Sequence, residues 1–279
     1  MLSKISKYIF AVISSIILVI LIVLVFLFFR LQQGPISITF LTPYVQEAIQ
    51  LNPDLQLDIT VEDCLLKWRS FDKGFDISLI GGKVKKRNND IIASIPEMFI
   101  SFDIDKILEL KLKLKSIEIN GPSLTIERNK SGKFDFGIGE HRQDKEIVRK
   151  LKKVLFEDIL RDKVYDLEKI EIFNAKIYYD DKLKSKKITS KDTDIIITKN
   201  KSDIDSVFMF TIENQTKDIP IKISSLYNMK SEFFDIGINF SNFSTSLITP
   251  FFDQLNPLNR ITSPLDGGLS FKIDQKGLL

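Results

Sequence analysis

Apolar and polar residues alternate with a period of two in nine runs that are spread over most of the chain. One run contains Leu57, Ile59 and Val61, and a later one contains Phe271 and Ile273. Successive side chains of a β-strand point to opposite faces, so each run places its apolar side chains on one face. Antiparallel sheets with one solvated face have this pattern, whereas buried parallel strands are apolar throughout. The sequence therefore predicts a mainly β protein with a one-faced, antiparallel sheet.

Helical signals in the body are few and short. A Thr-Pro pair precedes a predicted helix over Tyr44–Gln50, and Asp103 can cap another that ends at Leu108. The longest is Gln143–Arg161, where apolar residues recur at spacings of three and four. We expect this amphipathic helix to pack on the sheet, and its lysines leave open a second interpretation, a helix that lies on a membrane surface.

A weak internal repeat lies on both sides of that helix. Residues 114–119 read Leu-Lys-Ser-Ile-Glu-Ile, and residues 167–172 read Leu-Glu-Lys-Ile-Glu-Ile, an offset of 53 residues. In each copy a two-residue break follows, Gly121-Pro122 or Asn174-Ala175, before the alternation resumes. Repeated units of this kind build elongated sheets more readily than closed globules. We therefore expect an elongated, curved sheet.

Residues 9–29 contain no charged side chain and can span a bilayer. As a helix they would be about 31 Å long at about 1.5 Å per residue. The stretch is longer than a signal-peptide core, and no small-residue cleavage site follows it. Lys4 and Lys7 precede it, and after Arg30 no Lys or Arg occurs before Lys67. This distribution of cations predicts an uncleaved single-pass anchor with a cytoplasmic N-terminus and the body across the membrane.

The charge balance argues against a nucleic-acid partner. The chain has 40 Lys plus Arg, 37 Asp plus Glu and a formal net charge of +3. Lys4, Lys7 and Arg30 account for that excess, so the 249 residues after the anchor are neutral. Phosphate backbones bind to concentrated basic surfaces, which a neutral body does not predict.

The inventory of reactive side chains predicts no active site, metal site or cofactor. One His and one Cys cannot form a His/Cys metal cluster. His141 stands in a polar stretch, where we expect a solvated loop, and Cys64 stands in a predicted strand, where we expect core packing. The pair Asp180 and Asp181 lies amid lysines, as in a salt-bridged surface. We expect the protein not to be an enzyme.

The apolar faces of the strands need a cover, because burying each side chain is worth about 1.5–3 kcal/mol. A second sheet could supply it, as in a closed sandwich. The alternative is an open groove that lipid acyl chains complete, and the anchor places such a groove beside a source of lipid. The residues predicted to line it are Ile77, Leu79, Leu112, Leu114, Phe134, Phe136, Phe208, Phe210, Phe234 and Ile236.

Several short motifs, in their order along the chain, resemble a known family. They are Gly34-Pro35-Ile36-Ser37-Ile38-Thr39-Phe40-Leu41-Thr42-Pro43-Tyr44-Val45 after a single span, Leu65-Leu66-Lys67-Trp68, Ile95-Pro96-Glu97, Ile117-Glu118-Ile119-Asn120-Gly121-Pro122 with Leu124-Thr125-Ile126-Glu127-Arg128, and Pro264-Leu265-Asp266-Gly267-Gly268. This order resembles the N-terminal region of the AsmA-like envelope proteins, nearest to the YhdP branch.

The resemblance implies a bacterial inner-membrane protein with a periplasmic, repeating β-groove body. It implies a role in phospholipid transport between the inner and outer membranes and in outer-membrane integrity, and it carries over no catalytic residue. Family members are usually several times longer, so we expect the chain to be a fragment or a split gene product. The implied partners are phospholipid acyl chains, the inner membrane, and the remainder of a split groove or outer-membrane components.

Two other functions stay open from the sequence. One is an anchored structural or assembly factor that pairs its free strand edges with outer-membrane protein strands. The other is a non-functional remnant. In each case the predicted organisation is the same: an anchor over residues 1–30, a first groove segment over 31–140, the amphipathic helix over 141–163, and a second groove segment over 164–279.

Overall fold

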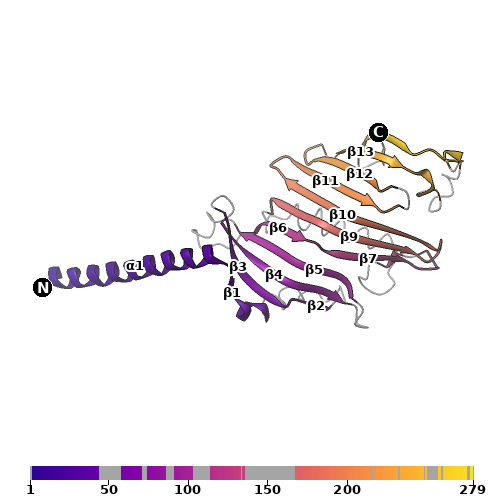
Figure 1. Ribbon diagram of the computed structural model, residues 1–279. Helices are drawn as coiled ribbons and strands as arrows, with labels where there is room; N and C mark the ends of the chain where they lie inside the picture. Colours follow the sequence, from indigo (N-terminus) through magenta and orange to yellow (C-terminus); the bar gives the residue numbers. More distant parts are fainter. Residues whose placement is uncertain are drawn as a thin grey trace.

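The protein consists of one long N-terminal helix and one large β-sheet (Figure 1). The structure is a computed structural model, and it describes residues 2–43, 58–70, 74–85, 91–102, 114–132, 134–135, 167–214, 217–231, 233–247, 249, 257–258, 260–274 and 277–278. The helices that we predicted over Tyr44–Gln50, Asp103–Leu108 and Gln143–Arg161 lie outside these residues. The prediction of a mainly β protein with one apolar N-terminal helix is confirmed.

The helix α1 (Leu2–Gln33) is continuous through the predicted anchor. Its stretch from Tyr8 to Gln33 is long and apolar enough to cross a membrane, and within it only Leu31 is buried. Large apolar side chains are exposed all around it, as in a helix that spans a membrane. The helix continues three residues beyond the predicted boundary and ends at Gly34, whose N–H donates to the Leu31 carbonyl at 3.3 Å.

The sheet has 15 strands, twelve of which follow one another in the order β1-β3-β4-β5-β6-β9-β10-β11-β12-β13-β14-β15. Their bounds are β1 Ile36–Ser37, β2 Asp58–Thr60, β3 Asp63–Ser70, β4 Gly74–Lys85, β5 Ile91–Phe102, β6 Leu114–Asn120, β7 Ser123–Arg128, β8 Phe134–Asp135, β9 Lys169–Asp181, β10 Lys186–Lys199, β11 Asp203–Ile212, β12 Ile219–Asn228, β13 Phe233–Phe243, β14 Leu265–Asp274 and β15 Gly277–Leu278. No described pairing joins β1 to β14 or β15, so the described sheet is open.

The sheet is antiparallel except at one junction. There β9 pairs in parallel with β6 and β7, so the sheet is mixed where the sequence predicted an antiparallel one. Parallel neighbours need a long crossover, whereas antiparallel ones need only a turn. Residues 136–168 separate β8 from β9 and supply that length. Both predicted groove segments therefore belong to one continuous sheet.

The parallel junction pairs the two copies of the internal repeat. Ser116 lies opposite Lys169 and Arg128 lies opposite Asp181, and both pairs have the offset of 53 residues that the sequence shows. The predicted breaks also coincide, because Gly121 and Asn174 have φ angles of 63° and 55°. The N–H of Gly121 donates to the carbonyl of Phe173 at 2.8 Å and joins the two breaks.

Left-handed residues recur on the later strands. Asp192 on β10 and Asn242 on β13 have φ angles of 51° and 54°, and the strand register shifts at both. The backbone N–H of Asn174 on β9 donates to Asp194 at 2.8 Å, and that of Asn242 donates to Asp266 at 2.7 Å, so a carboxylate on the neighbouring strand binds the backbone at both of these left-handed residues. Bulges bend and twist a sheet, which agrees with the predicted curvature.

Candidate functional site

One face of the sheet carries two parallel rows of mostly apolar side chains, one residue from each of ten strands. Directly paired residues point to the same face, so the register identifies the members of each row. The first row is Cys64, Leu79, Met98, Ile119, Ile172, Ile195, Phe208, Ile223, Ile238 and Leu269. The second row is Leu66, Ile77, Ile100, Ile117, Ile170, Ile197, Ser206, Ser225, Ile236 and Phe271. We call this surface the apolar face.

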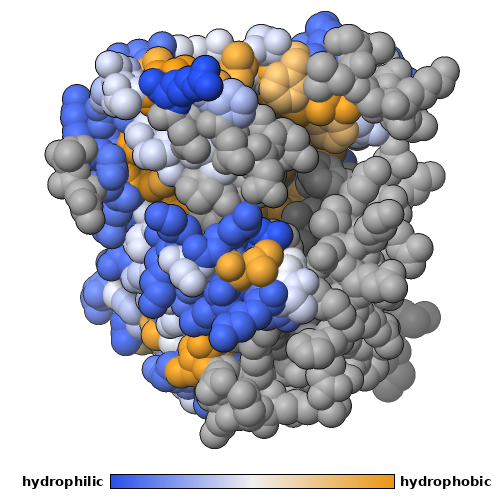
Figure 2. All heavy atoms as spheres, turned by 90° about the vertical axis from the view of Figure 1, so that its right-hand side faces the viewer, coloured by the Kyte–Doolittle hydropathy of each residue, from blue (hydrophilic) through white to orange (hydrophobic). Residues whose placement is uncertain are grey.

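Most of the apolar face is neither buried nor fully exposed. Only Cys64, Leu79 and Ser206 of the two rows are buried, and Leu269 at the far end is 59% exposed. Figure 2, which views the molecule from the side opposite to α1, shows hydrophobic residues among hydrophilic ones at that end of the sheet. The nine strand spacings from β3 to β14, at about 4.8 Å each, make the face about 43 Å long.

The apolar face begins beside the end of the anchor. Phe28 of α1 packs edge-on against Trp68 of β3, with ring centroids 5.2 Å apart. Trp68 packs in turn on Phe75 of β4 at 5.7 Å. Trp68 and Phe75 are a directly paired couple and follow Leu66 and Ile77 on the same face. The apolar surface therefore runs without a polar break from the membrane helix onto the sheet.

The structure places six of the ten predicted lining residues on this face. Ile77, Leu79, Phe208 and Ile236 belong to the rows themselves. Phe210 and Phe234 lie two residues away from Phe208 and Ile236 on the same strands, so they share the face. The backbones of Leu114 and Phe134 lie in β6 and β8, while Leu112 and Phe136 lie outside the described residues. Whether these residues contact lipid stays a prediction.

Leu79 differs from the other predicted lining residues. It is only 2% exposed and forms a packed cluster with Val61 and Cys64, over which Ile38 and neighbouring apolar residues pack. A ligand could reach it only by displacing that cluster. Leu79 is therefore a core residue, and Cys64 has the core position that the sequence predicted. The alternation could not separate the two roles, because both kinds of residue occupy the same face.

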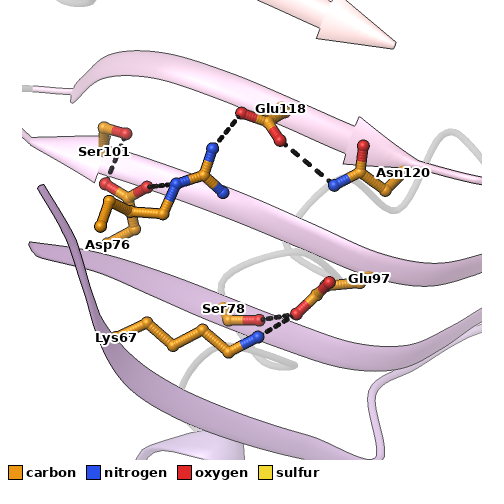
Figure 3. A network of polar contacts seen from close by, with 8 residues as sticks. Lys67, Asp76, Ser78, Glu97, Ser101, Glu118 and Asn120 are labelled. Carbon is orange, nitrogen blue, oxygen red and sulfur yellow. Dashed lines mark hydrogen bonds and ion pairs between the residues drawn. The ribbon is translucent and has the colours of Figure 1, made fainter. Parts of the chain in front are cut away.

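The opposite face carries a polar network over β3 to β6 (Figure 3). Arg69 lies 3.5 Å from Asp76 and 2.6 Å from Glu118, and Ser101 donates to Asp76 at 2.6 Å. Asn120 donates to the other oxygen of Glu118 at 3.2 Å. Asp76 is 1% exposed, so its charge depends on these partners.

A second set of contacts in Figure 3 joins the same strands. Lys67 pairs with Glu97, which also accepts a hydrogen bond from Ser78 at 3.0 Å. Lys67 and Arg69 cover the ring of Phe99 at 4.9 and 4.2 Å from its centroid. Side chains of the polar face thus form ion pairs and hydrogen bonds between β3, β4, β5 and β6. These contacts stabilise the strand pairing without any contribution from a ligand or partner on the apolar face.

A polar cluster closes the apolar face at the end of β7 and β9. Arg128 lies 3.3 Å from Asp181, which is fully buried and accepts a hydrogen bond from Tyr179 at 3.1 Å. Burial alone would raise the pKa of the Asp181 carboxyl, but hydrogen bonds from the Lys184 backbone N–H, Tyr179 and Arg128 hold this pKa below its usual value. Burial and the neighbouring Asp181 raise the pKa of Tyr179.

A hollow of about 620 Å³ lies against β10 to β14. Its lining includes Asp192, Asp194 and Asp266 together with Lys222 and Asn239. Within the described part of the chain, no group of three or more His, Cys, Asp or Glu residues could hold a metal ion. His141 lies outside that part. The hollow thus offers polar contacts beside the apolar side chains of Phe210, Ile221 and Phe240, and the described residues around it include no metal-binding group.

Comparison with protein-family models, curated proteins and solved structures finds no match to the chain. The resemblance to AsmA-like proteins therefore stays a hypothesis. The sequence did not predict the aromatic contact between Phe28 and Trp68 or the network around Arg69, because both join residues that are far apart along the chain. The only available signal was an aromatic residue at the end of the span and another within a predicted strand.

Proposed function

We propose that the protein is a membrane-anchored lipid carrier whose apolar face holds the acyl chains of phospholipids. Its place would be the bacterial inner membrane, with the body in the periplasm, and its role would be phospholipid transport between the inner and outer membranes and outer-membrane integrity. The observation that carries the proposal is the first row of the apolar face, which is apolar from Cys64 to Leu269 across ten strands and begins beside the contact between Phe28 and Trp68.

The dimensions and energetics of the apolar face support this proposal. It is about 43 Å long, whereas the hydrocarbon of one leaflet is about 15 Å deep, so the face has room for whole acyl chains. Each methylene that moves from water onto such a surface contributes about 0.8 kcal/mol. A lipid that leaves the bilayer at α1 would therefore keep its chains out of water throughout its passage.

The distribution of cations supports the proposed orientation. Lys4 and Lys7 precede the span, and no Lys or Arg occurs between Arg30 and Lys67. By the positive-inside rule the N-terminus is cytoplasmic and the sheet lies across the membrane. The resemblance to AsmA-like proteins supports the same placement.

Photo-crosslinking tests the proposal with a matched pair of positions. Ile195 on β10 is in the first apolar row, and its neighbour Ile196 points to the opposite face. A benzophenone amino acid at position 195 should crosslink to phospholipid in cells, and the same group at position 196 should not. Equal crosslinking at both positions, or none at position 195, would refute lipid binding by the apolar face.

A second candidate function is favoured by the edge of β14. Within the described residues, β15 pairs only with Ile273 and Asp274, so the rest of this edge is open. An open edge can accept a strand from another protein, such as an outer-membrane protein or a further part of a groove. A benzophenone amino acid at Ser270 should then give photo-crosslinks to a protein partner, while position 195 gives no lipid adduct.

A further inference from the structure

Positively charged side chains are concentrated at one end of the sheet, in two adjacent turns. The stretches concerned are residues 127–132, after the body of β7, and residues 180–187, around the turn between β9 and β10. Together they contain six cations and three acids. The cations are Arg128, Lys130, Lys182, Lys184, Lys186 and Lys187. Because the body as a whole is neutral, an excess of three positive charges within fourteen residues is a local feature of this end. We call these two stretches the basic tip.

Hydrogen bonds and an ion pair join the two turns at the base of the basic tip. The N–H of Lys182 donates to the carbonyl of Arg128 at 2.7 Å, which ties one turn to the other. The carboxylate of Asp181 is fully buried, lies 3.3 Å from Arg128 and accepts a hydrogen bond from the Lys184 N–H at 2.9 Å. The negative charge of Asp181 is therefore paired with Arg128 in the interior of the tip and is not presented to solvent. Asp180 contacts Lys182 and Lys187, so the outward surface still has a net positive charge.

The basic tip lies at the end of the strands opposite to the anchor. The anchor contacts Trp68, which lies two residues after Leu66, and the row of Leu66 crosses β9 at Ile170, near the start of that strand. The tip lies at the other end of β9, from Asp180 onward. The thirteen residues from Lys169 to Asp181 span about 40 Å. Figure 1 shows α1 at one side of the sheet and the β9 and β10 turn at the other.

An exposed apolar side chain lies at the centre of these charges. Leu183 is 42% exposed in the turn, and Lys187 beside it is 79% exposed. Figure 2, which faces this end of the molecule, shows a small hydrophobic spot surrounded by hydrophilic residues. Lysines around an apolar tip suit a bilayer surface, where the cations meet anionic headgroups and the leucine enters the interface. A nucleic acid would leave the leucine without a partner.

We propose that the basic tip docks on an anionic lipid bilayer, which gives the protein a second membrane contact some 40 Å from its anchor. The tip needs neither the apolar face nor bound lipid for this contact. It therefore adds to the proposed transport function and does not depend on it. If acyl chains do move along the sheet, the contact would bring an acceptor surface to the side of the sheet farthest from the anchor.

Binding to separate vesicles tests the proposal. The full chain is held in phosphatidylcholine nanodiscs, and co-flotation is measured with vesicles of pure phosphatidylcholine or with about 30 mol% phosphatidylglycerol. The variant Lys186→Gln/Lys187→Gln removes two cations from the tip. The control Lys201→Gln/Lys230→Gln removes two exposed cations from the turns at the anchor side of the sheet. Each lysine near an anionic surface changes binding about fivefold, so the tip variant should bind about 30-fold more weakly.

The expected results are binding only to anionic vesicles, loss in high salt, and less than a twofold change in the control variant. Leu183→Ser should weaken binding about fivefold, because a partly exposed leucine loses its burial in the interface. Equal binding to both kinds of vesicle, or an equal loss in the control variant, would overturn the proposal. So would an unchanged affinity of Leu183→Ser, since the tip would then be a general polyanion site. Crosslinking from position 195, measured on the same variants, reports separately on the apolar face.

Discussion

Replacing Phe208 with aspartate tests most directly whether the apolar face is open. Phe208 lies in the first row between Ile195 and Ile223, and its ring is parallel to that of Phe210 with centroids 6.5 Å apart. The side chain is only partly buried, so we expect the loss of about half its transfer free energy and of its ring contact, about 2 kcal/mol together. For a chain of this size that lowers Tm by about 4–8 °C. In a closed sandwich the buried carboxylate would cost several kcal/mol more and unfold the body.

Lipid binding should change much more than stability. A carboxylate against acyl chains costs about 3 kcal/mol, so phospholipid affinity at this position should fall about a hundredfold. Thermal unfolding and native mass spectrometry of the detergent-extracted full chain measure the two quantities. Met209→Asp is the control, because Met209 is the next residue, points to the opposite face and pairs with Lys222. A Phe208→Asp protein that unfolds, or that retains wild-type phospholipid, would refute an open lipid-binding face.

Three further substitutions test the packing, the polar cluster and the bulges. Leu79→Ala should cost about 3 kcal/mol in urea unfolding, because Leu79 is 2% exposed, and Ile77→Ala on the same strand should cost about half as much; equal losses would contradict the distinction between core and open face. Because the folded pKa of Asp181 is lowered, its stabilisation is present above the unfolded pKa of about 3.9 and is lost as pH falls through the folded pKa. Asp181→Asn should therefore remove part of the acid dependence of Tm, and a wild-type pH profile would count against the cluster. Gly121→Val should cost about 2 kcal/mol or more, since its φ is 63°, whereas Asn174→Gly should change the unfolding free energy little.

Alternation was sufficient to predict many of the strands, and six of the ten lining residues that it suggested lie on one face of the sheet. The runs at Phe75 to Leu79, Phe208 to Ile212 and Phe234 to Phe240 each lie within one strand, and their apolar side chains share a face of the sheet. Side-chain period is a local property, so the sequence contains it directly. The repeat also had a structural meaning, because its two copies are neighbouring strands in the register that the offset predicts.

Features that depend on distant contacts were not predictable in this way. The alternation gives no strand direction, so the parallel junction between β6 and β9 was missed. It also cannot show that Ile38 and Val61 close over Leu79 while Ile77 stays partly accessible. The partners of Arg69 come from β4 and β6, and the register of four strands places both Asp76 and Glu118 beside it.

The junction between the two repeat copies has a consequence for how long such a sheet can become. Its paired residues keep a constant offset of 53 on both sides of the left-handed residues Gly121 and Asn174. Both copies therefore bend at the same position, and their equivalent side chains point to the same face of the sheet. A further copy inserted in tandem would meet a neighbour with the same spacing of apolar residues. Each added strand would lengthen the apolar path by about 4.8 Å without altering its width. The distance that the sheet spans is thus a quantity counted in strands.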